Sequence, residues 1–138
     1  MIGEKLVQHD FDITVFNHEK GYIPNVGIYI NSDTKLWNIA KKYMDDNIYI
    51  GNIASGDIFC TDNNMSNKIY KKFNALCGEM EGAAIAQVCY LCKIPFLVIR
   101  SISDSPNKND NNKLTYDEFL EISSKKVCNY FLNILKKI

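Results

Sequence analysis

Three carboxylate side chains stand beside apolar runs in the second half of the chain. Glu79 and Glu81 lie two residues apart, just before the apolar stretch AAIAQVCYLC, and Asp104 follows the apolar run 96–99. A continuous apolar run is typical of a strand that is buried on both faces, and ligands of open α/β sheets collect at the carboxyl ends of such strands. We therefore expect these three carboxylates to meet at one edge of a sheet.

A second polar cluster, residues 55–60 (SGDIFC), follows the apolar run 48–53 and adds the aromatic ring of Phe59. One aromatic face, three carboxylates and several small residues suit a neutral, polyhydroxylated ligand with a flat ring better than a polyphosphate. The only two histidines, His9 and His18, are far upstream. Because divalent transition metals favour imidazole ligands, we expect no metal and no cofactor at this edge.

The five cysteines show no spacing typical of a disulfide framework. Cys89 and Cys92 form a CxxC pair, but no second pair follows, and both fall in an apolar helical pattern. Core packing is therefore favoured over metal or redox chemistry, since a buried free cysteine behaves as a small hydrophobe. An odd number of unpaired thiols fits a reducing compartment, so we expect a cytoplasmic protein.

The charge balance argues against whole classes of partner. Lysine and arginine together number 16, as do aspartate and glutamate, so the formal net charge is zero. A chain without a basic field is a poor binder of nucleic acid, and Arg100 is its only arginine. No apolar run approaches the roughly 18 residues of a membrane span. We expect one globular domain, residues 1–138, without nucleic-acid or membrane partners.

Hydrophobic periodicity predicts an α/β fold with a mainly parallel sheet. Strands are expected at 26–30, 48–53 and 96–99, and a further strand at 73–77. Helices are expected after Asp33, after an N-terminal cap at Ser66, across the stretch that follows Glu81, and from the Thr115/Glu118 capping box to the C-terminus. Residues 1–24 have a poor pattern, with only 12–16 as a short strand. We expect either a peripheral arm or a chain that has lost what came before it.

Four sequence segments occur in the order in which one known family has them. They are HDFDITVFNHEKGYIP, IASGDIFC, EMEGAAIAQVCYLCKIPFLVIRSISD and LTYDEFL. On these segments the chain resembles the bacterial 5'-methylthioadenosine/S-adenosylhomocysteine nucleosidases of the purine nucleoside phosphorylase superfamily. The resemblance implies a central mixed sheet flanked by helices, an active site at strand ends, a small nucleoside as ligand and a homodimer that completes the site.

The resemblance also implies roles for the residues around the scissile bond. Asp104 is similar to the general acid that protonates purine N7, so that adenine leaves as a neutral base, and Ser103 holds that carboxyl group. Glu81 is similar to the ligand of the two ribose hydroxyls, and its charge would offset the oxocarbenium-like sugar. Met80 would line the sugar and base, whereas Glu79 is only weakly linked to the site.

Further residues resemble those that surround the base and the 5'-substituent. Phe59 is similar to the aromatic residue that stacks on the purine, and the backbone of Cys60 would read the adenine edge. The remaining residues are apolar or aromatic and would form the 5'-alkylthio pocket. The neighbouring subunit would contribute Ile13, Phe16 and Pro24. Tyr116 would close the pocket.

The chain departs from the family pattern at the N-terminal side. Family members have an additional N-terminal portion with the first strands, a glycine-rich ribose site and the glutamate that activates the attacking water. The matching segments lie between His9 and Leu120, after that portion. We expect a sheet with an exposed strand edge and little hydrolysis by these residues alone. A phosphorolytic relative and a non-catalytic, adenine-binding fragment remain open as alternative interpretations.

Overall fold

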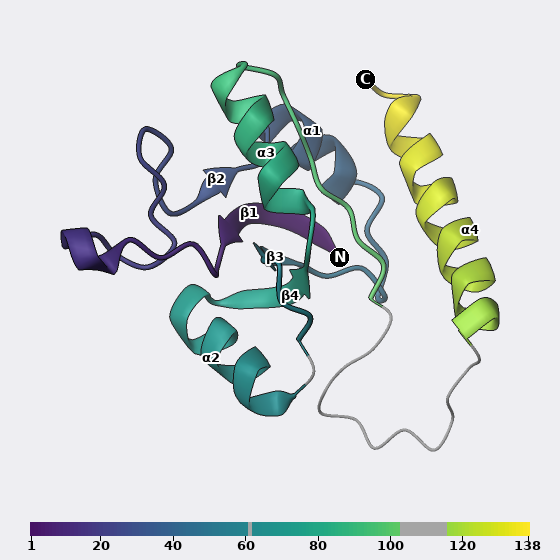
Figure 1. The fold of residues 1–138 in the computed structure, drawn as a ribbon. Coiled ribbons are helices and arrows are strands. Elements are labelled where there is room, and N and C mark those ends of the chain that lie inside the picture. Colours follow the sequence, from purple (N-terminus) through teal and green to yellow (C-terminus); the bar gives the residue numbers. More distant parts are fainter. Residues whose placement is uncertain (61, 103–115) are drawn as a thin grey trace.

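The computed structural model describes residues 1–60, 62–102 and 116–138, with 116–120 described as backbone only. These residues form four strands, four α-helices and one short 3-10 helix, shown in Figure 1. In chain order the elements are β1 (Ile2–Gln8), η1 (Thr14–Phe16), β2 (Ile30–Asn31), α1 (Thr34–Lys41), β3 (Ile50–Ser55), α2 (Asn63–Phe73), β4 (Ala75–Glu79), α3 (Gly82–Leu91) and α4 (Tyr116–Leu135).

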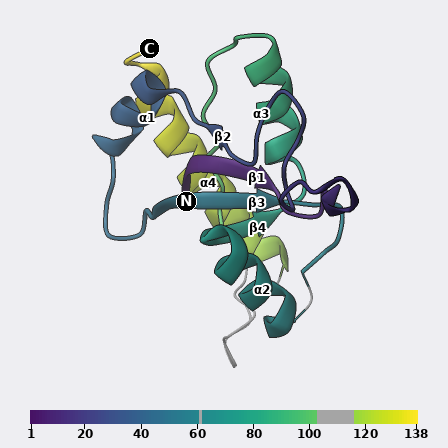
Figure 2. The ribbon, with the colours of Figure 1, turned by 90° about the vertical axis from the view of Figure 1, so that its left-hand side faces the viewer.

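The sheet has the strand order β2-β1-β3-β4. β1, β3 and β4 run parallel to one another, and the two-residue β2 is antiparallel to β1. The predicted α/β architecture with a mixed, mainly parallel sheet is therefore confirmed. In the parallel register Gln8 lies opposite Ser55, and Ser55 lies opposite Glu79. The three carboxyl ends are thus level, and Figure 2 shows the three arrowheads pointing toward the same side.

Helices cover both faces of the sheet because neighbouring residues of a strand point to opposite faces. Leu6 and Ile53 pack with Ala83 of α3 on one face, where the small side chain lets the helix approach the strands closely. Their neighbours Val7 and Ala54 pack against Phe73 of α2 on the other face. Figure 1 shows α3 and α2 on opposite sides of the strands, as this alternation requires.

A third core cluster joins the last helix to the rest of the fold. Ile134 of α4 packs with Ala40 of α1 and with Ile2 at the start of β1. The Tyr130 hydroxyl donates a hydrogen bond of 2.7 Å to the Ala40 carbonyl oxygen, and burial raises the pKa of Tyr130 to about 12. In the described part of the chain, no helix combines the length and the apolarity that crossing a membrane requires.

The predictions of a peripheral arm and of a short strand at 12–16 were wrong. Residues 2–8 form a central strand of the sheet rather than part of a peripheral arm, and 14–16 form η1 rather than a strand. The pattern of β1 is hidden by Glu4, which is exposed, and by Lys5, whose ammonium group lies 5.8 Å from the centre of the Tyr29 ring. η1 forms because the Asp12 carboxylate accepts the Thr14 N–H at 3.0 Å, which closes a turn.

The predicted strand 96–99 is also wrong, although its residues reach the sheet. The Gly3 N–H donates to the Val98 carbonyl and the Arg100 N–H donates to the Met1 carbonyl, each at 2.9 Å, around an isolated antiparallel bridge between Ile2 and Ile99. This segment occupies the edge of β1 beyond the very short β2. Because only one bridge forms, the segment is a connection and not a strand.

The other predicted elements differ mainly at their ends. Of the three candidate cap residues 31–33, Asp33 caps α1, since its carboxylate accepts the Leu36 N–H at 2.9 Å. α2 begins earlier than predicted, because Asp62 rather than Ser66 accepts the Met65 N–H at 2.7 Å. The strand expected at 26–30 is reduced to Ile30–Asn31. The capping box at Thr115 lies outside the described residues.

The fold leaves apolar surface uncovered around β4 and α3. Among the described residues β4 pairs with β3 only, and Leu76 on β4 is half exposed. The helix α3 is largely apolar in sequence, and its side chains Ile85 and Val88 are exposed. A helix that is apolar all round is typical of a position covered on every side.

Replacing Ile53 by alanine should lower the free energy of unfolding by about 2–5 kcal/mol, because a fully buried side chain leaves a cavity between α3 and the sheet. Ile58→Ala is the matched control, since Ile58 is 61% exposed and its loss should stay within about 0.5 kcal/mol. Urea denaturation of both variants gives the comparison. Equal losses of unfolding free energy in the two variants would contradict the position of Ile53 in the core.

Candidate functional site

Four side chains form what we call the strand-end cluster: Ser55, Glu79, Glu81 and Arg100. Ser55 and Glu79 are the last residues of the neighbouring parallel strands β3 and β4, and Glu81 is the residue directly before α3. Arg100 reaches them from the connection that runs beside β1. The sheet thus brings together the two clusters that the sequence placed at strand ends, at 55–60 and 79–81.

The Glu79 carboxylate caps α3. It accepts the Gly82 N–H at 2.8 and 2.9 Å and the Glu81 N–H at 3.2 Å, and only 6% of its side chain is exposed. The Ser55 hydroxyl donates to the same carboxylate and in turn accepts the Ala83 N–H at 2.7 Å. These bonds use the unpaired N–H groups of the first helical turn, where a negative charge is also favoured by the helix dipole.

Arg100 pairs with both glutamates. Its Nη2 atom lies 2.6 Å from Glu79 Oε2 and also contacts Glu81 Oε2. The Glu81 side chain is 60% exposed, so the guanidinium group anchors one oxygen of a carboxylate that otherwise faces solvent. The cluster therefore holds one buried structural carboxylate and one exposed carboxylate that is free to bind a ligand, with a net charge of one negative.

Cys77 lies behind the cluster on β4 and is buried. Burial raises the pKa of its thiol, and the negative charge of Glu79 raises it further. The group therefore stays a neutral thiol and packs as part of the core with Leu6 and Ile53. Its position gives it a structural role.

Residues 56–60, which we call segment 56–60, pass from β3 toward α2 beside the cluster. The Gly56 N–H donates to the Glu79 carbonyl at 3.1 Å, and the Asp57 N–H donates to Asp10 Oδ2 at 2.7 Å. The Phe59 side chain is 67% exposed, and Cys60 is half buried, with its thiol 3.8 Å from the Asp62 carbonyl. The segment thus presents an aromatic ring to solvent next to the strand ends.

His9 supports segment 56–60 from the end of β1. Its side chain is buried, and its backbone N–H donates to the Ser55 carbonyl at 2.9 Å. A Cβ atom on Gly56 would lie 2.3 Å from His9 Nε2, so only glycine fits at that position without a shift of the ring. Burial lowers the pKa of His9 and the charge of Lys20 lowers it further, whereas the charge of Asp10 raises it.

The structure leaves several sequence-predicted residues apart from the strand-end cluster. Phe16 and Pro24 are exposed and Ile13 is half buried, all in the turns that follow β1. Met80 is exposed between Glu79 and Glu81. Two predicted residues, Ser103 and Asp104, and the side chain of Tyr116 lie outside the described residues.

Sequence reasoning missed Arg100 and Asp10 as members of this region. A signal for Arg100 was present, because it is the only arginine in a chain whose other basic residues are lysine and histidine. A guanidinium group forms planar, multiple contacts with carboxylates that an ammonium group does not. Asp10 gave no comparable signal, since its partner Asp57 lies 47 residues away and contributes only a backbone N–H.

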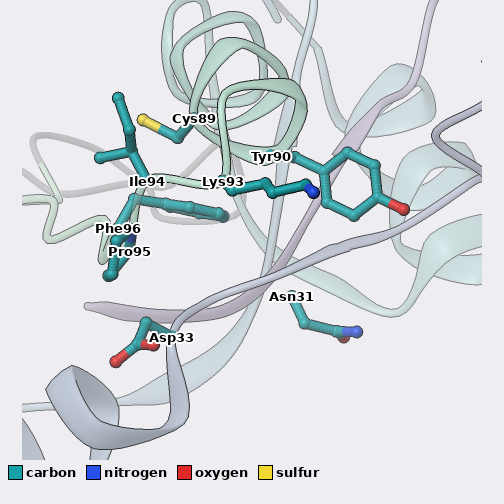
Figure 3. A pocket seen from close by; sticks show the side chains of 8 residues that line it. All are labelled: Asn31, Asp33, Cys89, Tyr90, Lys93, Ile94, Pro95 and Phe96. Atoms are coloured by element: carbon teal, nitrogen blue, oxygen red, sulfur yellow. The ribbon is translucent and has the colours of Figure 1, made fainter.

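The CxxC prediction was partly wrong, because Cys92 is exposed and Cys89 is only half buried. Cys89 lines an open cavity of about 240 Å³ at the far end of α3, shown in Figure 3 together with Asp33, Lys93 and Phe96. This cavity shares no residue with the strand-end cluster. In the described part of the chain, no three His, Cys, Asp or Glu side chains are grouped so that they could hold a metal ion.

Glu79→Gln should lower the free energy of unfolding by about 2 kcal/mol, because it removes the buried charge that faces Arg100 and weakens the cap of α3. The expected loss is moderate because the guanidinium group is partly exposed. Glu121→Gln is the control, since it breaks an exposed pair with Lys125 and should cost less than about 0.5 kcal/mol. Urea denaturation showing similar losses would refute the structural role of Glu79.

Stability should fall as the pH drops below the ordinary histidine pKa of 6.5, because His9 is held neutral in the fold. The unfolded chain takes up the proton at that pKa, whereas folded His9 does so only at a lower pH, so the stabilisation is complete above 6.5 and is lost below it. His9→Gln should flatten this dependence in urea denaturation between about pH 7.5 and 5.5. The control is His18→Gln, at an exposed histidine, which should keep the fall in stability with falling pH. If His9→Gln showed an equally steep fall, His9 would be excluded as its cause.

Comparisons with known proteins agree with this architecture. The family model described as "Phosphorylase superfamily" matches residues 1–136. The aminodeoxyfutalosine nucleosidase of Campylobacter jejuni is 38% identical over 141 residues, which cover 100% of this chain and 61% of that protein. The 5'-methylthioadenosine/S-adenosylhomocysteine nucleosidase of Bacillus cereus is 36% identical over 143 residues, with the same coverage.

Solved structures show the same likeness. The crystal structure of the Campylobacter jejuni 5'-methylthioadenosine/S-adenosylhomocysteine nucleosidase matches with a TM-score of 0.88 and 38% identity, over 99% of this chain and 60% of that one. The futalosine hydrolase of Helicobacter pylori matches with a TM-score of 0.86 and 32% identity, over 99% and 58%. The chain spans about three-fifths of the curated relatives that it matches. Because the family match extends over nearly all of its residues, the chain belongs to the phosphorylase superfamily.

Proposed function

We propose that the chain is part of a nucleosidase that hydrolyses the N-glycosidic bond of 5'-methylthioadenosine and S-adenosylhomocysteine and releases adenine. The observation that carries this proposal is the exposed Glu81 carboxylate, anchored by Arg100 at the strand ends. The exposed ring of Phe59 lies on segment 56–60, which leaves the end of the neighbouring strand. A carboxylate and an aromatic face are the groups that a ribose and a purine need. Relatives that match the whole chain are named as nucleosidases.

Glu81 is proposed to bind the two ribose hydroxyls. A carboxylate oxygen accepts hydrogen bonds from both hydroxyls, and its charge stabilises the positive charge that develops on the sugar as the base departs. Arg100 holds one oxygen of the Glu81 carboxylate in place. The Glu81 side chain therefore loses less conformational entropy when it binds the sugar. Met80 lies directly before Glu81 and is exposed, which leaves it available to the sugar.

Asp104 is proposed as the general acid that protonates purine N7, with Ser103 holding its carboxyl group. Adenine is a poor leaving group as an anion, and protonation lets it depart as a neutral molecule. Proton transfer of this kind contributes about 10²- to 10⁴-fold to the rate. Both residues lie outside the described part of the chain, so their roles rest on the sequence motif.

The base and the 5'-substituent are proposed to meet apolar groups. Phe59 would stack on the purine, and the backbone of Cys60 would pair with the adenine edge. The exposure of Phe16 and Pro24 supports a role in which one subunit of a homodimer lends them to its neighbour, together with Ile13. Tyr116 would close the pocket. Such an enzyme would act in the cytoplasm, in methionine salvage.

A second substrate is favoured by the names of two relatives. An aminodeoxyfutalosine nucleosidase and a futalosine hydrolase match this chain as well as the methylthioadenosine enzymes do. These names make aminodeoxyfutalosine and futalosine further candidate substrates of the same strand-end site.

Phosphorolysis is the alternative reaction, and adenine binding without turnover is the alternative for a non-catalytic chain. The net negative charge of the strand-end cluster disfavours a phosphate dianion beside Glu81, and the nucleosidase names of the relatives support water as the nucleophile. A rate that rises in proportion to phosphate would select phosphorolysis. Calorimetry that shows adenine binding without turnover would select the non-catalytic chain.

Asp104→Asn should lower the rate of adenine release from 5'-methylthioadenosine by about 10²- to 10⁴-fold, because the leaving base loses its proton donor. The assay uses the purified protein, with aminodeoxyfutalosine as a parallel substrate. Asp46→Asn, at an exposed carboxylate, is the control and should leave the rate unchanged. No release by the parent protein, or an unchanged rate in Asp104→Asn, would refute the proposed reaction.

A further inference from the structure

The turn directly after β1 contacts segment 56–60 through a single side-chain hydrogen bond. Asp10 Oδ2 accepts the Asp57 N–H at 2.7 Å, across 47 residues of sequence. An N–H bond to an ionised carboxylate is stronger than one between neutral groups. This bond fixes the backbone of the segment one residue beyond Gly56, where the hydrogen bonds of the sheet end.

His9 supports the same point by packing. Its backbone N–H donates to the Ser55 carbonyl, which extends the pairing of β1 with β3 by one residue, and its ring occupies the space in front of Gly56. A Cβ atom added to Gly56 would lie only 2.3 Å from His9 Nε2. The ring therefore leaves no room for Gly56 to move toward it. His9 therefore limits movement from one side, and Asp10 holds the next residue in place.

The Asp10 side chain has one oxygen atom whose burial lowers the stability of the fold. Its second oxygen, Oδ1, is buried and has no hydrogen-bond partner among the described residues. Buried polar atoms without partners are rare, because each costs about 1–3 kcal/mol. An asparagine would not remove this cost, since it would place an amide either against the Asp57 N–H or in the space around Oδ1.

Beyond Asp57 the segment has few other anchors among the residues that the structure describes. The side chains of Ile58 and Phe59 are largely exposed, and the Cys60 thiol makes a long contact with the Asp62 carbonyl. The direction of the Phe59 ring and of the Cys60 backbone is therefore set mainly where the segment leaves the sheet. Loss of the Asp10 bond would free both.

We propose that Asp10 is a positioning residue that, with His9 packed against Gly56, holds segment 56–60 in the conformation that receives the adenine base. This inference rests on the proposed function for the identity of the ligand. It assigns Asp10 no contact with the ligand, because it acts on the Asp57 N–H. The affinity for adenine is then set partly by a carboxylate two residues beyond the first strand of the described sheet.

Amide hydrogen exchange tests the positioning role without any ligand. In Asp10→Asn, the Asp57 amide should exchange at least about tenfold faster, because it loses the carboxylate acceptor, while the amides of β4 stay as in the parent. Asp12→Asn is the matched control, since Asp12 lies two residues away, is exposed and contacts the local Thr14 and Lys20. Faster exchange throughout the sheet, or no change at Asp57, would overturn the inference.

Calorimetry with adenine tests the functional half. The protein should bind adenine about tenfold more weakly after Asp10→Asn, a loss of about 1.4 kcal/mol, and equally well after Asp12→Asn. Equal adenine affinity in Asp10→Asn, despite faster exchange, would overturn the link between the segment and the base. A parent protein that does not bind adenine would instead refute the proposed function, while the exchange result would still decide the positioning role.

Discussion

The buried Glu79 carboxylate connects four parts of the structure that the sequence keeps apart. It ends β4, caps the first turn of α3, accepts the hydroxyl at the end of β3 and pairs with Arg100 from the connection beside β1. A carboxylate with 6% exposure is tolerated only because every side of it meets a donor. The position of α3, and with it the position of Glu81, depends on this set of bonds.

The same arrangement explains how two glutamates two residues apart take different roles. Glu79 is the last residue of β4 and bonds the N–H groups at the start of α3, whereas Glu81 follows the turn and faces solvent. One arginine contacts both, so the charge of Glu79 is compensated inside the fold and the outer carboxylate keeps a free oxygen. This division leaves Glu81 able to bind a hydroxylated ligand without loosening the helix.

Some elements could be predicted because their signals are local. The Asp33 cap and the apolar face after it predicted α1, and the apolar run after Asn47 predicted β3, since burial on both faces produces such a run. The errors occurred where tertiary contacts outweigh local pattern. Residues 2–8 contain Glu4 and Lys5 and became a central strand through pairing on both sides, while the apolar residues 96–99 found only one bridge.

The sequence by itself determined the α/β class, the residue types at the strand ends and the resemblance to nucleosidases, because these reside in periodicity and in contiguous motifs. Only the tertiary structure decided that Arg100 joins the two glutamates and that Asp10 holds the backbone at Asp57. These contacts link residues 19 to 47 positions apart through single atoms. No local pattern encodes such contacts, because they exist only once parallel strands place their carboxyl ends side by side.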